Sequence, residues 1–230
     1  MGRGGIARRL LFGDRIFYYL FELIRKREMN IWEHCKISVR KFGGVEKDYF
    51  EIHKFIDSSK LFYFHVKHRL LLHNLYGIHI GIKKFGDILV NTNGEVILVR
   101  DIIAEHLKED LSGKVPSLNE WLIDNDKEIS KGITLPNFAN QELEEFIMMP
   151  MMMSNLKSSL LITLSDFGVY LTNEILGFDY AKELMGLIEK EKTVKSYLEQ
   201  FTFTQRWQYC PDKKELEWLK NQKNGKQIKT

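Results

Sequence analysis

The 230-residue sequence lacks the features that mark several large protein classes. It has only two cysteines, Cys35 and Cys210, which are too few for a disulfide framework. Its apolar runs all fall short of the roughly 18 residues that a membrane-spanning helix needs. The composition, 44% hydrophobic and 12% aromatic, excludes a disordered chain. We therefore expect a cytoplasmic globular protein.

Signature motifs of common enzyme classes are also absent. The sequence has neither a Walker A loop nor a G-x-G-x-x-G fingerprint, which argues against nucleotide binding by those routes. It has no G-x-S-x-G elbow for a nucleophilic serine. Cys35 directly follows His34, and neighbouring residues of a helix point their side chains apart, so the two do not form a nucleophile and base pair.

Basic residues are concentrated at the two ends of the chain. Residues 1–28 contain seven Lys or Arg and three acidic residues, and residues 212–230 contain six Lys and three acidic residues. Because the whole chain carries only +3, the body between these ends is mildly acidic. Nucleic-acid binding by the body is therefore not expected, despite a pI near 8.7.

The first 28 residues are predicted to form a basic, amphipathic extension. An aromatic and aliphatic block over residues 16–24 is flanked by arginines on both sides. Two interpretations are open for such a helix. It packs on the protein's own core or on a partner helix, or it lies on an anionic membrane surface as a peripheral contact.

The pattern of apolar residues and breakers predicts a mainly α fold, a helical bundle with one small β-hairpin at about 87–99. The hairpin turn is indicated by Asn93-Gly94. Helices are predicted over 31–41, 47–55, about 60 to 85, 101–111 and a short segment around Trp121, and then over about 141–149, 154–176, 179–200 and 212–221, with breaks at Pro150, Gly177 and Pro211.

The composition shifts divide the chain into segments. The basic extension covers 1–28, a His-rich helical domain with the hairpin covers 29–123, and a polar linker covers 124–140. A helical C-terminal domain follows over 141–222, with a basic tail at 223–230. We therefore expect two helical subdomains.

Histidine is absent before residue 34 and after residue 106, so all seven histidines fall in the first of these subdomains. If residues 60–85 form one helix, a rotation of roughly 100° per residue places His65, His68 and His79 on one largely apolar stripe. His73 would then point to the other side. The helix is predicted to present imidazoles on its inward face.

Two pairs of residues share the spacing His-x-x-x-Asp. They are His53 with Asp57 and His106 with Asp110. An i, i+4 spacing places both side chains on one helix face about 6 Å apart, so that a ring nitrogen and a carboxylate oxygen reach the same ion. With His68, these four residues form a predicted site for a divalent metal, Zn, Mn or Fe. Alternatively, each pair forms only a helix-surface hydrogen bond or a helix-dipole interaction.

An ion with an open coordination position lowers the pKa of bound water, which favours hydrolysis as the chemistry. Glu105, beside the second pair, is the candidate general base. Lys54, Arg69 and Arg100 are candidates for binding the phosphate of a small phosphorylated substrate, although each is explained equally well as surface charge.

Several phrases between residues 29 and 122 resemble a small bacterial and phage family, a domain of unknown function. They are SVRKFGG (38–44), DYFEIHKFIDSSK (48–60), KHRLLLH (67–73), TNGEVILVRDI (92–102) and EHLKEDLSGKVPSLNEWL (105–122). The resemblance implies a domain that begins near Met29 and whose signature phrases contain the predicted ligands and His73. The chain departs from the family where a second histidine is expected beside His73 and Asn74 is found. HD-type phosphohydrolases are also helical, but this chain has no His-Asp dipeptide.

Two functions of different class remain open. The first is a metal-dependent hydrolase of a phosphoester or nucleotide. The second is a non-catalytic interaction module, a host or phage regulatory protein that binds a protein partner through aromatic and Met-rich surfaces. The Met-rich segment at 148–153 is the candidate for such a surface, and it is equally typical of core filling.

Overall fold

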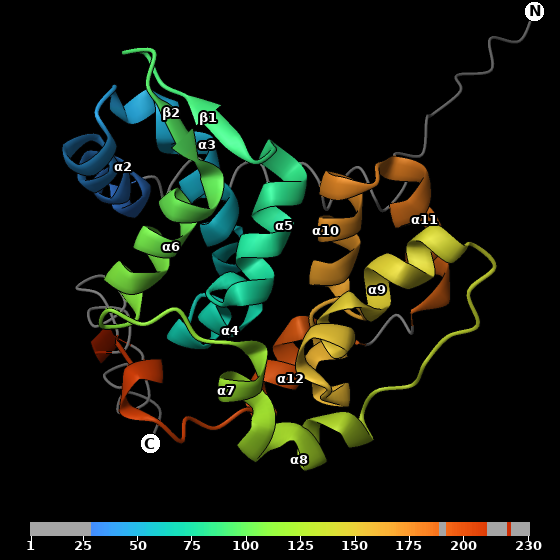
Figure 1. The fold of residues 1–230 in the computed structure, drawn as a ribbon. Coiled ribbons are helices and arrows are strands. Elements are labelled where there is room, and N and C mark those ends of the chain that lie inside the picture. The colour runs from blue at the N-terminus through green and yellow to red at the C-terminus, as the bar shows by residue number, and fades with distance from the viewer. Residues whose placement is uncertain (1–28, 189–191, 211–219, 222–230) are drawn as a thin grey trace, which may run out of the picture.

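The computed structural model describes residues 29–188, 192–210 and 220–221, and this part of the chain is mainly α-helical (Figure 1). The predicted fold class is confirmed, because the described elements are helices together with one antiparallel hairpin of two strands. The predicted basic extension and basic tail lie outside the described residues, as does most of the helix predicted at 212–221.

The first two helices form as the sequence predicts. α2 (Met29–Phe42) packs against α3 (Glu46–Ile56), and the chain turns between them at Gly43 and Gly44. These glycines have φ values of 73° and 69°, a region that other residues adopt only with strain. The turn therefore explains why two glycines stand together here.

The predicted hairpin is also present. β1 (Ile88–Val90) pairs with β2 (Val96–Leu98) in antiparallel register, and Leu89 lies opposite Ile97. Gly94 in the turn has a φ of 81°. α6 (Val99–Asp110) follows β2 directly, so that the hairpin leads the chain into the helix that carries His106.

The single long helix predicted from about 60 to 85 is wrong. The segment instead forms two short 3₁₀ helices and two α-helices: η1 (Asp57–Leu61), η2 (Val66–His68), α4 (Arg69–Leu72) and α5 (Leu75–Phe85). Asn74 explains the break before α5, because its side-chain oxygen accepts a hydrogen bond from the Gly77 amide at 3.1 Å and so caps this helix. The histidine stripe that the long helix would have presented does not form, and His73 lies in the turn between α4 and α5.

The chain then crosses towards its C-terminal half through short helices. These are α7 (Leu118–Leu122), η3 (Ile123–Asn125) and α8 (Asp126–Lys131). Ser117 and Glu120 form a capping box at the start of α7, where the Ser117 hydroxyl accepts from the Glu120 amide. α8 thus occupies part of the segment predicted as a linker.

In the C-terminal half, the break predicted at Pro150 is wrong. α9 (Gln141–Ser154) runs through it, and Pro150 is buried near the helix end. The long helix predicted at 154–176 is also wrong, because Asn155 has a φ of 57° and Ser165 caps a separate helix. The elements that follow α9 are η4 (Lys157–Leu161), α10 (Asp166–Ile175), α11 (Phe178–Leu187), α12 (Val194–Gln200) and η5 (Arg206–Gln208).

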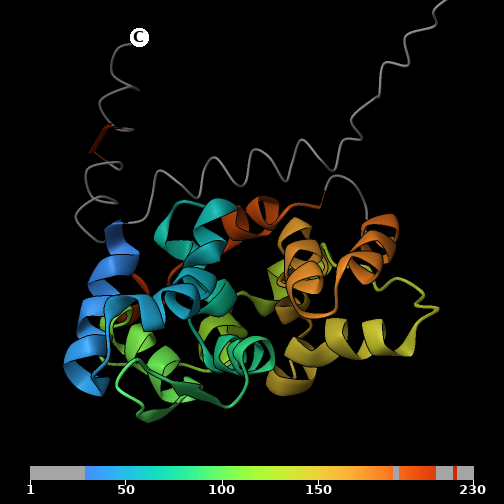
Figure 2. The same cartoon turned by 90° about the horizontal axis from the view of Figure 1, so that it is seen from above.

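Buried apolar side chains from both halves form one continuous cluster. α5 contacts α10, and Figure 1 shows these two helices side by side between the hairpin end and the α9 to α11 end. The view from above shows the same arrangement, with α2 and α11 at opposite sides of the molecule (Figure 2). The division into two domains at 124–140 stays a prediction. Among the described residues, both halves contribute side chains to one hydrophobic core.

The turn between α4 and α5 gives a prediction about stability. A Cβ added at Gly77 would lie 1.7 Å from the carbonyl oxygen of Leu72, which is backbone and cannot move aside. Gly77→Ala is therefore expected to lower the free energy of unfolding by about 3 kcal/mol in urea titrations. Gly186→Ala is the matched control, since nothing lies within 4 Å of its added Cβ. An equal effect of both substitutions would contradict the close approach at Gly77.

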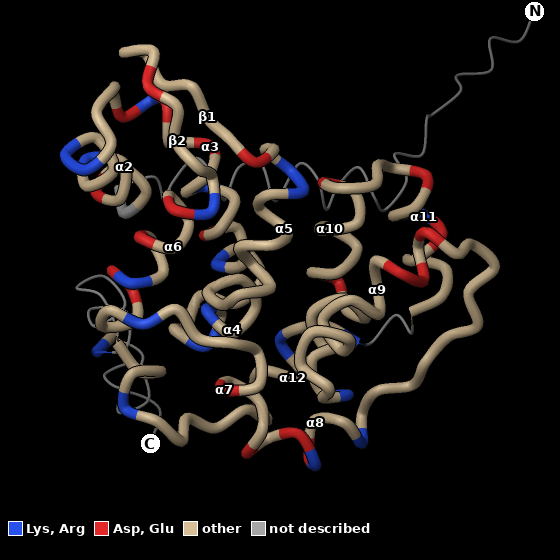
Figure 3. Tube along the Cα trace, viewed as in Figure 1, with Lys and Arg blue, Asp and Glu red and all other residues tan. Residues whose placement is uncertain are grey.

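Charged residues of both signs are interspersed along the described trace (Figure 3). In this part of the chain, no helix has the length and apolar character needed to cross a membrane. Apart from Lys220, the basic residues that the sequence concentrates at its two ends lie outside the described ranges.

Candidate metal centre

Four side chains from three separate segments converge in the interior of the N-terminal half. Asp57 begins η1, His73 lies between α4 and α5, and His106 and Asp110 are on α6. One potential ligand atom from each of the four lies within 4.8 Å of every other. We call these four residues the Asp/His centre.

Local structure explains how each segment presents its side chain. His106 and Asp110 are one helical turn apart, so that both face the same side of α6. His73 has ψ of 60°, outside the helical region, because Asn74 ends α4 and starts α5. The indole Nε1 of Trp121 donates to the carbonyl oxygen of His73 at 3.2 Å, which fixes this turn from the other side. The backbone is therefore held on both sides of the imidazole.

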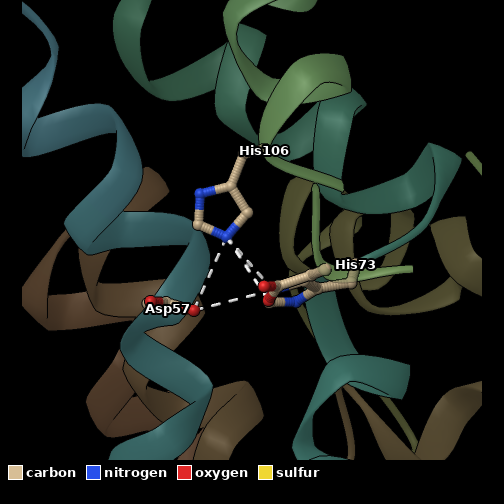
Figure 4. Close-up of side chains that lie close together, drawn as sticks. Asp57, His73 and His106 are labelled. Atoms are coloured by element: carbon tan, nitrogen blue, oxygen red, sulfur yellow. Dashed lines mark hydrogen bonds and ion pairs between the residues drawn. The ribbon is translucent and has the colours of Figure 1, made fainter. Parts of the chain in front are cut away.

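The distances within the Asp/His centre are close to those of a metal coordination shell. The Nε2 atoms of His73 and His106 are 3.2 Å apart, and each lies 3.6 Å from Oδ1 of Asp57 (Figure 4). Oδ2 of Asp110 lies 3.0 Å from Nε2 of His73 and 3.9 Å from Nε2 of His106. Ligand atoms of a tetrahedral zinc ion, each roughly 2.0 to 2.1 Å from the metal, are about 3.3 Å from one another. The four atoms surround a space of that size.

One buried oxygen of the centre has no hydrogen-bond donor in the part of the chain that the structure describes. Oδ1 of Asp57 receives no hydrogen bond from the described residues, although it is inaccessible to solvent. An unsatisfied buried carboxylate oxygen is costly, and such an atom calls for a partner such as an ion. Its nearest polar neighbours in the centre are two imidazole nitrogens at 3.6 Å, which is too long for a hydrogen bond.

His53 and His106 are held in the neutral form that binds metals. Burial lowers the pKa of His106 to about 3, with a contribution from the neighbouring His34. Burial also lowers the pKa of His53 to about 2, assisted by the nearby His106 and His34. Because a neutral ring nitrogen has a free lone pair, no proton competes with an ion at these positions near neutral pH.

The two carboxylates of the centre are ionised. Burial opposes ionisation of Asp57, but Lys60 at 2.8 Å and the two imidazoles hold its pKa well below the usual value. Burial likewise opposes ionisation of Asp110, and Arg69, whose Nε lies 3.1 Å away, outweighs it together with His73. The centre therefore offers two imidazole nitrogens and two anionic oxygens.

A second layer of hydrogen bonds lies behind His106. Its Nδ1 is 2.9 Å from Nδ1 of His53, and Nε2 of His53 is 2.8 Å from the hydroxyl of Ser38. If Nε2 of His106 gives its lone pair to an ion, its Nδ1 carries the proton and donates to His53, whose Nε2 then donates to Ser38. Ligand histidines are usually oriented in this way, by a hydrogen bond from the ring nitrogen that does not bind the ion.

A similar pair lies behind His73. His68 packs edge-on against it with ring centroids 5.3 Å apart, and Nδ1 of His68 is 2.8 Å from the hydroxyl of Ser59. Nε2 of His68 and Nδ1 of His73 are both buried, with no hydrogen-bond partner among the described residues. Burial holds the pKa of His68 well below its usual value, so this imidazole is neutral as well.

His34 lies at the edge of the centre and differs from the other imidazoles. Its ring stacks on His106 with centroids 3.9 Å apart, and its Nδ1 is 2.5 Å from a carboxylate oxygen of Glu109. Burial lowers its pKa, but the Glu109 hydrogen bond and the nearby Asp110 outweigh burial and raise it. The pKa of His34 is therefore raised, whereas burial lowers the pKa of His53, His68 and His106.

The structure brings together three of the five ligands that the sequence predicts, Asp57, His106 and Asp110. His53 and His68 lie one layer outside them. Of the candidate phosphate-binding residues, Arg69 is buried against Asp110. The others are at the surface: Lys54 pairs with Glu51, Arg100 with Asp101, and the candidate base Glu105 with Lys41 and Lys108.

Sequence reasoning missed His73 and Lys60. His73 was placed on the far side of a helix that does not exist, and the signal that would have found it is Asn74, a residue favoured at helix N-caps. Lys60 follows Asp57 by three residues in η1, which brings its amine 2.8 Å from the carboxylate. The sequence DSSK contains this pair. A short 3₁₀ turn at this sequence places the side chains of Asp57 and Lys60 on the same face.

The comparison with known families matches one segment of the chain. Residues 29–130 match the family described as Domain of unknown function (DUF6915). This confirms the resemblance seen in the sequence phrases, and the segment contains all four residues of the Asp/His centre. Residues after 130 lie outside the match. Neither a curated protein nor a solved structure matches the chain.

Proposed function

We propose that this protein binds one divalent transition-metal ion at the Asp/His centre. The observation that supports the proposal most directly is the convergence of four ligand atoms from three segments around one point, with Oδ1 of Asp57 left without a donor among the described residues. A purely structural polar cluster would satisfy its carboxylate oxygens with donors. An ion at the centre satisfies all four atoms at once.

The ligand set narrows the identity of the ion. Two imidazoles with two carboxylates suit Zn, Mn or Fe, and the absence of thiolate among these four ligands argues against a Cys-type structural zinc site. The imidazole nitrogens disfavour Mg and Ca, which prefer ligand shells made of oxygen. Zinc would use the four protein atoms as a tetrahedral shell, whereas Mn or Fe in octahedral coordination would leave two positions for exogenous ligands.

Hydrolysis of a phosphoester or nucleotide is the chemistry that we propose for an ion with such open positions. A bound ion would act as a Lewis acid and would activate water near neutral pH. The support is the donor set together with Lys60 and Arg69, which lie beside the two carboxylate ligands. Glu105 does not suit the role of general base, because Lys41 and Lys108 hold it at the surface.

An interaction module is the second candidate function, and exposed apolar side chains favour it. Met152 and Met153, at the end of α9, are 77% and 46% exposed, and flexible thioether side chains are adaptable contacts for partner proteins. The outer face of the hairpin is also apolar and exposed at Val90 and Val96. This candidate needs no ion, so the metal content of the protein separates the two.

The test is the metal content of the full-length protein. Protein purified without chelator is stripped, equilibrated separately with Zn²⁺, Mn²⁺ and Fe²⁺ under exclusion of oxygen, and measured by mass spectrometry of the elements. We expect about one equivalent of at least one of these metals per chain after dialysis. Less than about a tenth of an equivalent of every metal, in protein with native circular dichroism, would overturn the proposal.

A further inference from the structure

A segment far along the chain from the Asp/His centre contacts the residues that hold its ligands. Residues 201–210, which we call the 201–210 segment, lie outside the family match at 29–130. The segment follows α12, contains η5 and lies below α6 in the view of Figure 1. Two separate connections run from it to two residues of the centre, each through one buried side chain.

The first connection runs through Trp121 to His73. The rings of Trp207 and Trp121 meet edge to face, with centroids 4.9 Å apart. Phe201, at the start of the same segment, also lies against the Trp121 ring, with centroids 6.1 Å apart. Trp121 is 1% exposed, and its indole Nε1 donates to the carbonyl oxygen of His73 at 3.2 Å. The 201–210 segment therefore positions the indole that holds the backbone of His73.

The second connection runs through Arg69 to Asp110. Nη1 of Arg69 donates to the carbonyl oxygen of Cys210 at 2.5 Å, and Nε of the same guanidinium donates to Oδ2 of Asp110 at 3.1 Å. This oxygen is the one that lies 3.0 Å from Nε2 of His73. Because a guanidinium is planar and rigid, an acceptor at one of its nitrogens sets the direction of the others. The contact with Cys210 therefore helps to orient the Asp110 carboxylate.

The 201–210 segment has its own contacts with the rest of the protein. The amide of Thr202 donates to Oδ1 of Asn125 at 2.9 Å, and its carbonyl oxygen accepts from Nδ2 of Asn125 at 3.0 Å. The ring of Phe203 stacks on His65 with centroids 6.0 Å apart. Residues 204–206 are exposed, and η5 is only three residues long. We therefore expect the segment to open locally at a lower free energy than global unfolding requires.

We infer that the 201–210 segment positions the ligands of the Asp/His centre, with Trp207 and Arg69 as positioning residues, so that metal binding and docking of the segment stabilise each other. This inference rests on the proposed function. When the segment opens, His73 and Asp110 each lose a support, and residues behind metal ligands typically contribute roughly 10 to 100-fold to metal affinity. Such coupling is reciprocal, so a bound ion disfavours opening by the same factor. The complete metal-binding unit thus extends beyond the residues that match the family.

Competition titration of full-length variants with a chelator tests the inference, with the metal that the wild-type protein takes up. Trp207→Ala is expected to lower the metal affinity by at least about tenfold. Trp207→Phe, which keeps a ring against Trp121, should recover most of the loss. Phe138→Ala is the matched control, because Phe138 is also a partly buried aromatic residue but lies between α8 and α9. While circular dichroism shows that the folded form predominates, a loss of global stability alone does not change the metal affinity.

Hydrogen exchange of the wild-type protein measures the reciprocal effect and needs no substitution, so it decides the question even if Trp207→Ala does not fold. We expect the metal to slow amide exchange over residues 201–210 by at least about tenfold, and to change exchange over α11 much less. Unchanged metal affinity in folded Trp207→Ala, or unchanged exchange over residues 201–210, overturns the inference and leaves the proposed function intact. Protein that takes up no metal overturns both.

Discussion

His106→Ala is expected to abolish stoichiometric metal binding, whereas His53→Ala is expected to weaken it by about 10 to 100-fold. The two histidines are matched for this comparison, because both side chains are completely buried and their rings lie against each other. Only His106 directs a nitrogen at the Asp/His centre. His53 contacts it from behind, at 2.9 Å between the Nδ1 atoms.

The physical reason for the difference is the role of each nitrogen. Removing His106 deletes one of four donor atoms and leaves a space that water fills. Removing His53 leaves all four donors in place but frees the His106 ring to rotate and removes the acceptor of its Nδ1 proton. Both substitutions remove similar buried volume, so both lower the stability of the metal-free protein by a similar amount of about 2 to 4 kcal/mol.

The measurement is a competition titration with a chromophoric chelator for each purified variant, with circular dichroism as the control for folding. His79→Ala serves as a further control, since His79 on α5 lies outside the centre. Equal losses of metal affinity in His106→Ala and His53→Ala would show that His106 affects metal binding only through packing and is not a ligand. Unchanged affinity in His106→Ala would remove this residue from the ligand set.

The spacing of His106 and Asp110 shows what sequence alone predicts of such a site. Both residues are in one helix, so an i, i+4 rule that depends only on helix geometry places them on one face. The same rule does not hold for His53 and Asp57, because α3 ends at Ile56 and η1 begins at Asp57. Asp57 therefore turns into the centre and His53 stays behind it.

The position of His73 depends on a single cap that the helix pattern obscures. The apolar residues between 60 and 85 keep a helical period on both sides of Asn74, so periodicity predicts one continuous helix. The Asn74 side chain bonds to Gly77 instead, and the backbone leaves the helix at His73. Fold class depends on the sum of many such patterns and survives this local error, whereas a metal centre depends on the direction of individual side chains.

Lowering the pH from 7 to 5 is expected to destabilise the metal-free protein by about 4 kcal/mol through His53 and His106 alone. In the folded chain these imidazoles remain neutral, because burial lowers their pKa to about 2 and about 3. In the unfolded chain they take up protons below about pH 6.5, so the unfolded state is favoured as the pH falls. Their stabilising contribution is therefore complete above that pH and is lost progressively between about 6.5 and 3.

Other ionisable groups of the region also contribute to the pH dependence of the stability. The lowered pKa of Asp57 and Asp110 adds stability that is lost only below about pH 4, and the raised pKa of His34 favours the folded state in acid.

Urea unfolding of chelator-treated protein at pH 7, 6 and 5 measures the effect. His53→Asn should reduce the loss of stability between pH 7 and 5 by about 2 kcal/mol, because one buried neutral imidazole is gone. A free energy of unfolding that is unchanged across this range would mean that these imidazoles are protonated in the folded protein. His106 would then be a poor metal ligand, so the outcome would also contradict the proposed centre.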